Sequence, residues 1–209
     1  MVTHKPGNVS FEEAAAVGFG GTTAMHFLRK GEVKAGEKVL VIGASGGVGT
    51  AMVQLAKHLG AEVTGVTSGG NVELVRRLGA DRVVDYGRED FAVGAERYDV
   101  VADVVGARSL GDCMGVLREG GRVLAVAGGV REMVAAGWGM LGGGGRKRVV
   151  AGPAEERAED WERVAGMLGE GVLKAVIDRR FEFGEMVEAH GYVETGRKRG
   201  SVVVRVGEG

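Results

Sequence analysis

One stretch near the start of the chain, residues 38–60, restricts the fold more than any other. It opens with the β-favouring run Lys38-Val-Leu-Val-Ile42 and passes directly into the small residues Gly43-Ala-Ser-Gly-Gly-Val-Gly49. The apolar residues that follow recur at the spacing of one helix face: Val48, Ala51, Met52, Leu55, Ala56 and Leu59. Gly60 then stands where a left-handed residue commonly ends a helix. The stretch predicts a strand, a glycine turn and a helix.

The glycine turn has the properties of an anion-binding site. A helix that begins directly after such a turn directs unpaired backbone N–H groups and the positive end of its dipole at one place, which suits a pyrophosphate. Against the dinucleotide fingerprint G-x-G-x-x-G, Ala44 takes the place of the first glycine, and Gly46 and Gly49 take the second and third. Alanine makes this turn if its φ stays negative, whereas Gly46 admits the phosphates and Gly49 allows close packing of helix and strand. From the turn alone a plain β–α loop is the alternative, and the repeated units downstream favour the nucleotide site.

Further β-favouring segments follow the turn, separated by helical patterns. The expected strands are residues 62–66, 82–85, 98–105, 121–127 and 148–151. Residues 98–105 read as a continuous apolar run, which is typical of a strand buried in a parallel sheet. Strands that alternate with helices indicate a parallel sheet covered on both faces, and right-handed crossovers make it doubly wound. We therefore expect an α/β fold whose sheet has about six strands.

The expected helices are short, and glycines interrupt or end several of them. Ser10 and Glu13 form a capping box that opens a short helix ending at Val17; Gly18-Phe-Gly-Gly21 breaks it, and a second helix spans residues 22–30. Asn71 is expected to cap a helix over residues 72–78, which Gly79 ends. Further helices are expected around Leu110, Cys113, Met114 and Leu117, over residues 130–141 before the loop 142–145, and along Ala154, Ala158, Trp161, Ala165 and Leu168.

The last part of the chain departs from this alternation. Residues 175–183 are expected to be extended, residues 184–195 helical and residues 201–206 a strand, and none of them has an obvious partner in the chain. They predict a C-terminal helix–strand appendage. The expected organisation is lead-in helices over residues 1–36, a nucleotide-binding domain over 37–172 and a C-terminal segment over 173–209.

Composition excludes several classes of protein. The 209 residues carry a net charge of −1, which gives no reason to expect a nucleic-acid or membrane partner, and Arg197-Lys-Arg199 is interpreted as a solvated surface. No run of about 18 apolar residues is present, and residues 1–6 lack the apolar segment of a secretory signal. The single cysteine excludes an internal disulfide and a multi-cysteine zinc lobe. A soluble cytoplasmic protein is expected.

Glycine is over-represented, at 40 of 209 residues, against a usual share of about 7%. Several glycines, such as Gly115 and Gly166, fall inside expected helices, where each costs roughly 1 kcal/mol relative to alanine. We therefore expect a marginally stable fold.

Motifs along nearly the whole chain carry a family resemblance. They are Phe11-Glu-Glu-Ala-Ala-Ala, Gly21-Thr-Thr-Ala, Gly43-Ala-Ser-Gly-Gly-Val-Gly, Leu78-Gly-Ala-Asp-Arg-Val-Val-Asp-Tyr86, Tyr98-Asp-Val-Val, Gly120-Gly-Arg-Val and Arg199-Gly-Ser-Val-Val-Val. With these motifs the chain resembles the cofactor-binding half of medium-chain dehydrogenases/reductases, of the zinc-independent quinone-reductase or enoyl-reductase kind. The resemblance implies a Rossmann fold. Family members normally begin with a barrel-like substrate domain. We expect that domain to be missing from this chain, and we expect residues 173–209 to be a segment that would pack on it.

The resemblance also implies where each part of a bound NAD(P)H lies. The positions expected for the phosphates are Ser45, Gly46, Gly47, Val48 and Gly49. Thr23 matches a threonine near the nicotinamide, and a structural threonine at a helix N-terminus is the alternative. The positions that match the strand ends beside the nicotinamide ribose are Val105, Gly106, Ala127 and Gly128. The alternative is that these small residues only pack the sheet edge.

The end of the second strand favours NADPH over NADH. An enzyme that prefers NAD places Asp or Glu there to hold the ribose 2′-OH, whereas this chain has Val66-Thr-Ser68. Ser68 could donate to a 2′-phosphate, and Tyr86 matches a family tyrosine that reaches the same phosphate. The family often has a basic residue at one of the two positions that are Gly70 and Asn71 here. The helix start at Asn71 and the nearby Arg76 compensate for it only in part.

Other chemistries lack their signatures. The four histidines are scattered and Cys113 falls on an apolar helix face, so no set of about four convergent zinc ligands is visible. The short-chain reductases need a Tyr-x-x-x-Lys pair, but the three tyrosines are followed at that spacing by Asp90, Ala102 and Gly196. A methyltransferase would also need an acid after the second strand.

Two functions remain, and they belong to different classes. The first is an oxidoreductase that transfers hydride from NADPH to a quinone or an α,β-unsaturated carbonyl, with no catalytic side chain assigned in this chain. The second is a non-catalytic nucleotide-binding module, either truncated or one half of a two-chain enzyme. The resemblance further implies a homodimer through the edge of the sixth strand, residues 148–151.

Overall fold

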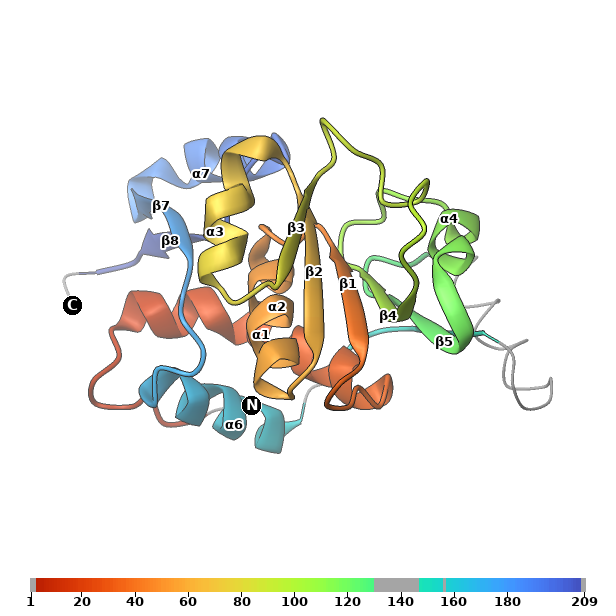
Figure 1. The fold of residues 1–209 in the computed structure, drawn as a ribbon. Helices are drawn as coiled ribbons and strands as arrows, with labels where there is room; N and C mark the ends of the chain where they lie inside the picture. The colour runs from red at the N-terminus through yellow and green to blue at the C-terminus, as the bar shows by residue number, and fades with distance from the viewer. Residues whose placement is uncertain (1–2, 130–146, 156, 208–209) are drawn as a thin grey trace.

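In the computed structural model, residues 3–129, 147–155 and 157–207 are described. Their main feature is a parallel sheet with helices on both faces (Figure 1). The sheet has the order β3-β2-β1-β4-β5-β6, and every neighbouring pair is parallel. Its strands are β1 Lys38–Ile42, β2 Glu62–Thr67, β3 Arg82–Asp85, β4 Tyr98–Asp103, β5 Leu117–Ala125 and β6 Arg148–Ala151. The expected doubly wound α/β sheet is confirmed.

Alternation along β1 divides the core into two layers. Val39 and Val41 face one apolar cluster, to which helices α1, α2, α3 and α6 contribute. Leu40 and Ile42 face the other, which contains Phe91 and α4. Figure 1 shows α1, α2, α3 and α6 on one side of the sheet and α4 on the other. The helices are α1 Phe11–Lys30, α2 Gly47–His58, α3 Val72–Arg77, α4 Leu110–Gly115, α6 Ala158–Gly169 and α7 Met186–Glu194.

Helix α1 corrects one expectation. The Ser10–Glu13 capping box is confirmed, but the helix runs without a break to Lys30. Gly18 and Gly21 do not end it, because both lie against α6: a side chain on Gly18 would begin 2.8 Å from Trp161, and one on Gly21 would begin 2.9 Å from Val164. The glycines permit close helix packing, which outweighs their low helix propensity.

Three further boundaries differ from the sequence prediction. Asn71 precedes α3 but its side chain does not cap it, and a short 3₁₀ turn, η1 Gly69–Asn71, comes first. Leu117 belongs to β5, where it pairs with Tyr98, and not to the helix before it. Strand β4 ends at Asp103 because the carboxylate of Asp103 accepts hydrogen bonds from the N–H groups of Val105 and Gly106 and so turns the chain. The predictions for residues 130–141 and 142–145 lie outside the described residues.

The two strands of the C-terminal segment pair with each other. Strands β7 Ile177–Glu182 and β8 Ser201–Arg205 pair in parallel as a two-stranded sheet, joined by η2 Phe183–Glu185 and α7. The expectation that these pieces lack a partner in the chain was wrong, because the crossover through α7 brings β8 back beside β7. The expected appendage is confirmed, and the domain boundaries at residues 36 and 172 stay predictions.

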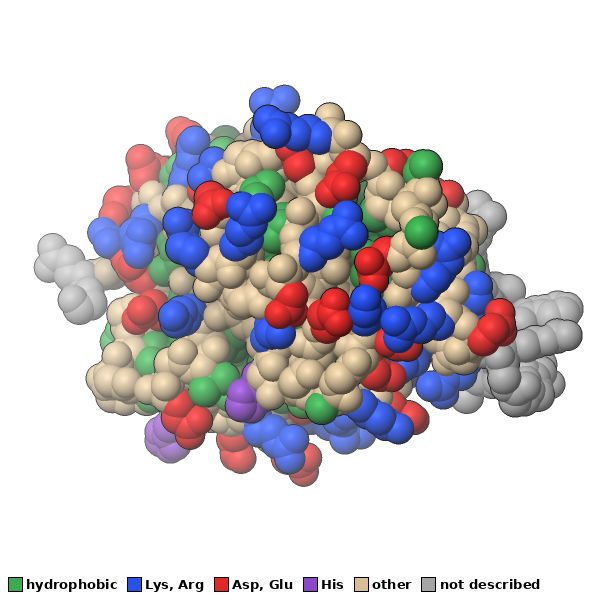
Figure 2. Space-filling model, viewed as in Figure 1, with side chains coloured by type: hydrophobic (Ala, Val, Ile, Leu, Met, Phe, Trp, Pro, Cys, Tyr) green, Lys and Arg blue, Asp and Glu red, His purple; other side chains and the backbone are tan. Residues whose placement is uncertain are grey.

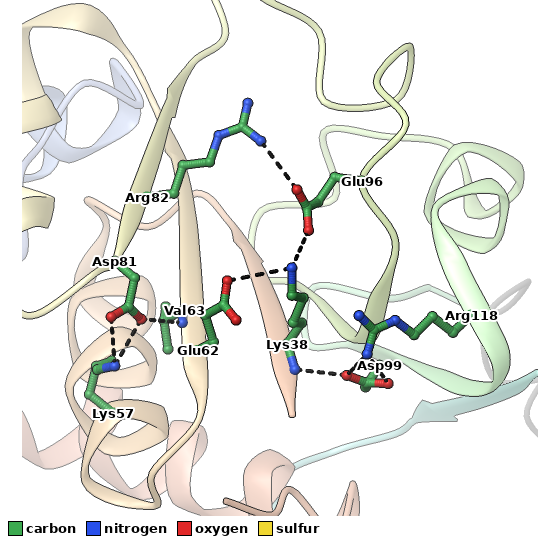
Figure 3. A network of polar contacts seen from close by, with 9 residues as sticks. All are labelled: Lys38, Lys57, Glu62, Val63, Asp81, Arg82, Glu96, Asp99 and Arg118. Carbon is green, nitrogen blue, oxygen red and sulfur yellow. Dashed lines mark hydrogen bonds and ion pairs between the residues drawn. The ribbon is translucent and has the colours of Figure 1, made fainter. Parts of the chain in front are cut away.

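The amino ends of the strands carry a network of charges (Figure 3). Lys38 pairs with Glu96 at 2.5 Å and with Glu62 at 3.6 Å. Lys57 pairs with Asp81 at 2.8 Å, and Asp81 also accepts from the backbone N–H of Val63. The other members in Figure 3 are Arg82, Asp99 and Arg118. These ion pairs lie at the end of the sheet opposite the glycine turn, on a face where Figure 2 shows acidic and basic side chains next to one another.

Candidate cofactor site

The glycine turn lies at the carboxyl end of β1, and three glycines in or beside it leave no room for a side chain. Gly43 has φ +84° and its carbonyl accepts the N–H of Gly46. A side chain on Gly49 would begin well under 3.0 Å from the same carbonyl oxygen. From α1, a side chain on Gly20 would begin 2.5 Å from the carbonyl oxygen of Gly47. The turn is therefore packed too tightly for any other residue at these positions.

Gly43 is the residue that sequence reasoning missed. The fingerprint alignment placed the tight turn at Ala44, but Ala44 is fully buried and its N–H donates to Val66. The left-handed conformation belongs to the residue before it. A glycine directly after a β-favouring run was the available signal, because only glycine adopts that conformation without strain.

Helix α2 begins at this turn with open donors. Its N-cap is Gly46, which has no side chain to cap the helix. The first N–H groups of a helix have no partner within the helix. Here the Gly47 N–H lies beside the Gly200 carbonyl across the Gly46–Gly200 bridge, and those of Val48 and Gly49 are open. Together with the helix dipole they form a place for an anion.

Hydroxyl groups lie beside the turn at the end of β2. The hydroxyl of Ser45 accepts hydrogen bonds from Thr67 Oγ1 at 2.8 Å and from Asn71 Nδ2 at 3.2 Å. Asn71 Nδ2 also donates to the hydroxyl of Ser68 at 3.1 Å. A serine hydroxyl has one proton and two acceptor lone pairs, so Ser45 and Ser68 keep their protons free to donate.

Asn71 contributes an unsatisfied acceptor to the same corner. Its Oδ1 atom is buried and has no hydrogen-bond partner among the described residues. A buried polar atom without a partner is uncommon and points to a missing group. A ribose hydroxyl is a donor of the right kind.

Two predicted contributors at this corner lie differently. Tyr86 follows β3, its N–H donates to Thr67, and its side chain is exposed. Arg76 pairs with Glu73 at 2.7 Å on α3, so it is already engaged by an acidic side chain. Of these two side chains, that of Tyr86 therefore remains available to a ligand at the sheet edge.

The ends of β4 and β5 form the other half of the site. Val105 and Gly106 are exposed after β4, and Ala127 and Gly128 are exposed after β5. A side chain on Gly106, at φ +67°, would begin 3.5 Å from the carbonyl oxygen of Ala127, so the two turns are adjacent. Val105 also contacts the first turn, because its methyl groups lie beside Gly43.

Thr23 lies in the middle of α1 and is buried. Its expected alternative role, at a helix N-terminus, was wrong because α1 begins at Phe11.

Cys113 lines a small cavity of about 140 Å³ with Gly106, Ala127 and Gly128. Burial raises the pKa of the Cys113 thiol to about 12, so the thiolate is not populated at neutral pH.

The C-terminal segment also reaches the turn, a contact that no sequence pattern predicts. Gly46 and Gly200 form an isolated parallel bridge, and the Gly200 N–H donates to the Ser45 carbonyl at 2.7 Å. Lys198 is half-buried there, with Nζ 3.5 Å from the point where a side chain on Gly47 would begin. Burial lowers the pKa of Lys198, and the Asp178 carboxylate opposes that shift. The interpretation of residues 197–199 as a solvated surface was wrong for Lys198.

A nicotinamide dinucleotide fits this set of groups. The carboxyl edge of the sheet carries open N–H donors, two free hydroxyl protons and one buried acceptor without a partner among the described residues. Open parallel sheets bind ligands in this position, at the carboxyl ends of the strands where the strand order reverses. In this sheet the reversal lies between β1 and β4.

The family is decided by comparison with known proteins. A family model described as "Zinc-binding dehydrogenase" matches residues 78–204, which is more than half of the chain. The chain belongs to the medium-chain dehydrogenase/reductase superfamily. The resemblance carried by the sequence motifs is confirmed.

Several relatives in this superfamily are named as reductases or oxidoreductases. The chain is 36% identical over 208 residues to a 2-methylene-furan-3-one reductase of Solanum lycopersicum, covering 98% of this chain and 49% of the relative. It is 33% identical to the chloroplastic NADPH-dependent alkenal/one oxidoreductase of Arabidopsis thaliana, covering 98% and 50%. The solved structure of a quinone oxidoreductase from Coxiella burnetii superposes with a TM-score of 0.85 at 30% identity, covering 98% and 64%.

The chain thus spans about half the length of the two curated superfamily relatives named above. Across the described residues, no group of three or more His, Cys, Asp or Glu side chains is placed to hold a metal ion. In the same part of the chain, no helix is long and apolar enough to cross a membrane.

Proposed function

We propose that this chain binds NADPH and forms the cofactor-holding part of a reductase that acts on a quinone or an α,β-unsaturated carbonyl. The observation that carries the proposal is the turn at Gly43–Gly49 with its open N–H groups, next to a second strand that ends in Thr67 and Ser68 without a carboxylate. The named activities of the relatives support the substrate class.

Each group at the sheet edge has a proposed task. The N–H groups of Val48 and Gly49, with the hydroxyl of Ser45, hold the pyrophosphate. Ser68, Asn71 and Tyr86 face the adenosine ribose and its 2′-phosphate. Thr23 is proposed to lie near the nicotinamide, and the proposed positions beside the nicotinamide ribose are Val105, Gly106, Ala127 and Gly128. When bound, NADPH supplies the hydride, and these residues orient the nucleotide and cover one side of it from water.

NADPH is proposed over NADH on electrostatic grounds. A carboxylate at the end of β2 would accept from a ribose 2′-OH and repel a 2′-phosphate. Ser68 stands there instead, half-buried, with its hydroxyl proton free. A neutral donor at this position suits the phosphate.

A non-catalytic nucleotide-binding module is the second candidate. It is favoured by the share of each relative that the chain covers, 49% and 50%. Both candidates require NADPH binding, and only the first requires turnover.

One experiment separates the two candidates. The chain is incubated with NADPH and a panel of quinones and enones, and the absorbance of the reduced nicotinamide is followed, with binding measured in parallel by its fluorescence. Binding with acceptor-dependent NADPH oxidation supports the reductase. Saturable binding without oxidation favours the module, and no binding contradicts both.

We also propose that the chain forms a homodimer through β6. The proposed location is the cytoplasm, as the composition predicts. Among the described strands β6 is an edge of the sheet, and Val149 and Val150 lie along it. An apolar sheet edge invites pairing with another chain. Light scattering at micromolar concentration should give twice the chain mass, and Val150→Lys should halve it. A monomeric wild-type chain would refute the dimer.

A further inference from the structure

The corner beside Ser68 contains a cation that comes from the far end of the chain. The point where a side chain on Gly70 would begin lies 3.9 Å from Nη2 of Arg199. Gly70 belongs to η1, the first turn after β2. Positions 70 and 71 themselves carry no charge, since they are Gly70 and Asn71.

Arg199 is held there by its backbone. Its N–H donates to the Asp178 carboxylate at 3.0 Å, and the same carboxylate accepts from the Tyr192 hydroxyl at 2.5 Å. The next residue, Gly200, is tied to the glycine turn through the Ser45 carbonyl. Gly200 has φ +59° and a side chain there would overlap Val176, so this crossing is available only to glycine. The segment therefore delivers residue 199 to a fixed place.

The side chain of Arg199, by contrast, is available to a ligand. It is exposed, and among the described residues its guanidinium forms no ion pair. The other carboxylate near the corner is Asp85, which lies 2.7 Å from the point where a side chain on Gly69 would begin. Asp85 is engaged by Arg88 at 3.5 Å and by the N–H of Gly87. The Arg199 guanidinium is thus a cation at this corner that has no acidic partner among the described residues.

We propose that Arg199 determines the cofactor specificity of the chain by binding the 2′-phosphate of NADPH. This inference rests on the proposed function. A guanidinium binds a phosphate through two parallel charge-assisted hydrogen bonds and stays charged at every physiological pH. Ser68 supplies a neutral donor at the same corner, and Arg199 supplies the charge that the η1 turn lacks.

Lys198, the neighbouring cation, makes a useful comparison. Its Nζ lies near Gly47 at the start of α2 and donates to the Gly200 carbonyl at 2.8 Å. That place faces the pyrophosphate position, which NADH and NADPH share. Adjacent cations are therefore expected to act differently: Lys198 on both nucleotides, and Arg199 on NADPH alone.

The test measures nucleotide binding by the full chain, with no acceptor present. NADPH and NADH are titrated against wild type, Arg199→Gln and the matched control Arg197→Gln, an exposed arginine two residues away. Arg199→Gln removes a pair of charge-assisted hydrogen bonds. It should therefore weaken NADPH binding by about tenfold or more and change NADH binding by about twofold at most. Arg197→Gln should change neither by more than about twofold.

A second variant guards against an indirect effect. Gly70→Arg in the Arg199→Gln chain returns a guanidinium to the corner from η1, where a side chain on Gly70 would meet no atom closer than Arg199 Nη2 at 3.9 Å. It should restore at least part of the NADPH affinity. Adenosine 2′,5′-bisphosphate, which lacks the nicotinamide, should follow NADPH across all variants.

The outcomes are distinct. Unchanged NADPH binding in Arg199→Gln, or an equal loss for NADPH and NADH, overturns the role of Arg199 while leaving the proposed function intact. Failure of the wild-type chain to bind either nucleotide overturns the proposed function and this inference with it.

Discussion

A side chain on Gly49 would begin well under 3.0 Å from the carbonyl oxygen of Gly43, a separation that real Cβ atoms do not adopt. Gly43 follows β1 directly and has a left-handed conformation, and Gly49 lies in the first turn of α2. The pair therefore sets how closely the helix approaches the strand, and with it the direction of the open N–H groups.

Gly49→Ala should disrupt the fold and the site together. The added methyl group meets backbone atoms that cannot move without opening the turn, and overpacking of this kind costs about 1–3 kcal/mol. Urea unfolding should give a free energy of unfolding lower by that amount, and NADPH binding should be lost.

Gly46→Ala is the matched control for that substitution. Gly46 has φ −80°, and a side chain there would begin 3.6 Å from the Gly43 carbonyl, an ordinary contact distance. Its free energy of unfolding should stay within about 1 kcal/mol of wild type, while NADPH binding weakens because the methyl group occupies the phosphate side. Equal stability losses in the two variants would contradict the packing argument.

Ser68→Asp should reverse the cofactor preference. The new carboxylate would repel a 2′-phosphate and accept from a ribose 2′-OH, as at the second strand of NAD-dependent proteins. NADPH affinity should fall by about tenfold or more while NADH affinity rises. Ser68→Asn, which removes the hydroxyl without adding charge, should weaken NADPH less. The assignment of Ser68 fails if Ser68→Asp and Ser68→Asn have the same effect.

The abundant glycines should divide into two classes. Gly166 lies in α6 with no atom within 4 Å of an added side chain, so Gly166→Ala should raise the free energy of unfolding by about 0.5–1 kcal/mol. Gly20 also lies in a helix, but an added side chain would begin 2.5 Å from the Gly47 carbonyl. Gly20→Ala should therefore destabilise. Thermal unfolding of both variants checks this, and shifts of the same sign would disprove the distinction.

His26 should make stability depend on pH. Burial, with Lys30 and Arg29 nearby, lowers the pKa of His26 in the folded chain below its ordinary value. The unfolded chain therefore binds more protons than the folded chain as the pH falls through about 6.5, and the free energy of unfolding decreases there. Above about pH 7 this contribution is complete and constant.

His26→Asn tests that dependence. Its side-chain oxygen can replace Nδ1 as the acceptor of the Glu155 N–H, which lies 3.2 Å from that atom. Urea midpoints at pH 5 and pH 7 should differ less in the variant than in wild type. Parallel changes in the two proteins would rule out His26 as the source.

The sheet was predictable because its signals are local. Strands β1, β3 and β6 begin and end where the β-favouring runs do, and Gly60 and Gly79 have the positive φ expected of helix ends. Features that depend on tertiary contacts were not predictable. The glycines of α1 look like breaks in the sequence, and only the presence of Trp161 and Val164 beside them explains why the helix continues.

The candidate site also has one part that was predictable from local sequence and one part that depends on tertiary contacts. The turn, Ser45 and Ser68 are adjacent to recognisable strands, so their place at one edge followed from topology. Lys198 and Arg199 reach that edge only because β7 and β8 pair with each other and Gly200 crosses beside Ser45. Nothing in the local sequence of residues 197–199 distinguishes that arrangement from an exposed loop.

The central claim is that NADPH lies along the carboxyl edge of the sheet with its phosphates at the start of α2. Backbone amide NMR of the ¹⁵N-labelled chain, titrated with NADPH, tests this most directly because each amide reports its own position. The largest shifts should fall on Gly46, Gly47 and Gly49, followed by Ser68, Gly106 and Ala127, with saturation at one nucleotide per chain. NADH should shift the turn amides while leaving Ser68 less affected. Absence of saturable shifts at the turn, or shifts centred on another surface, would contradict the account.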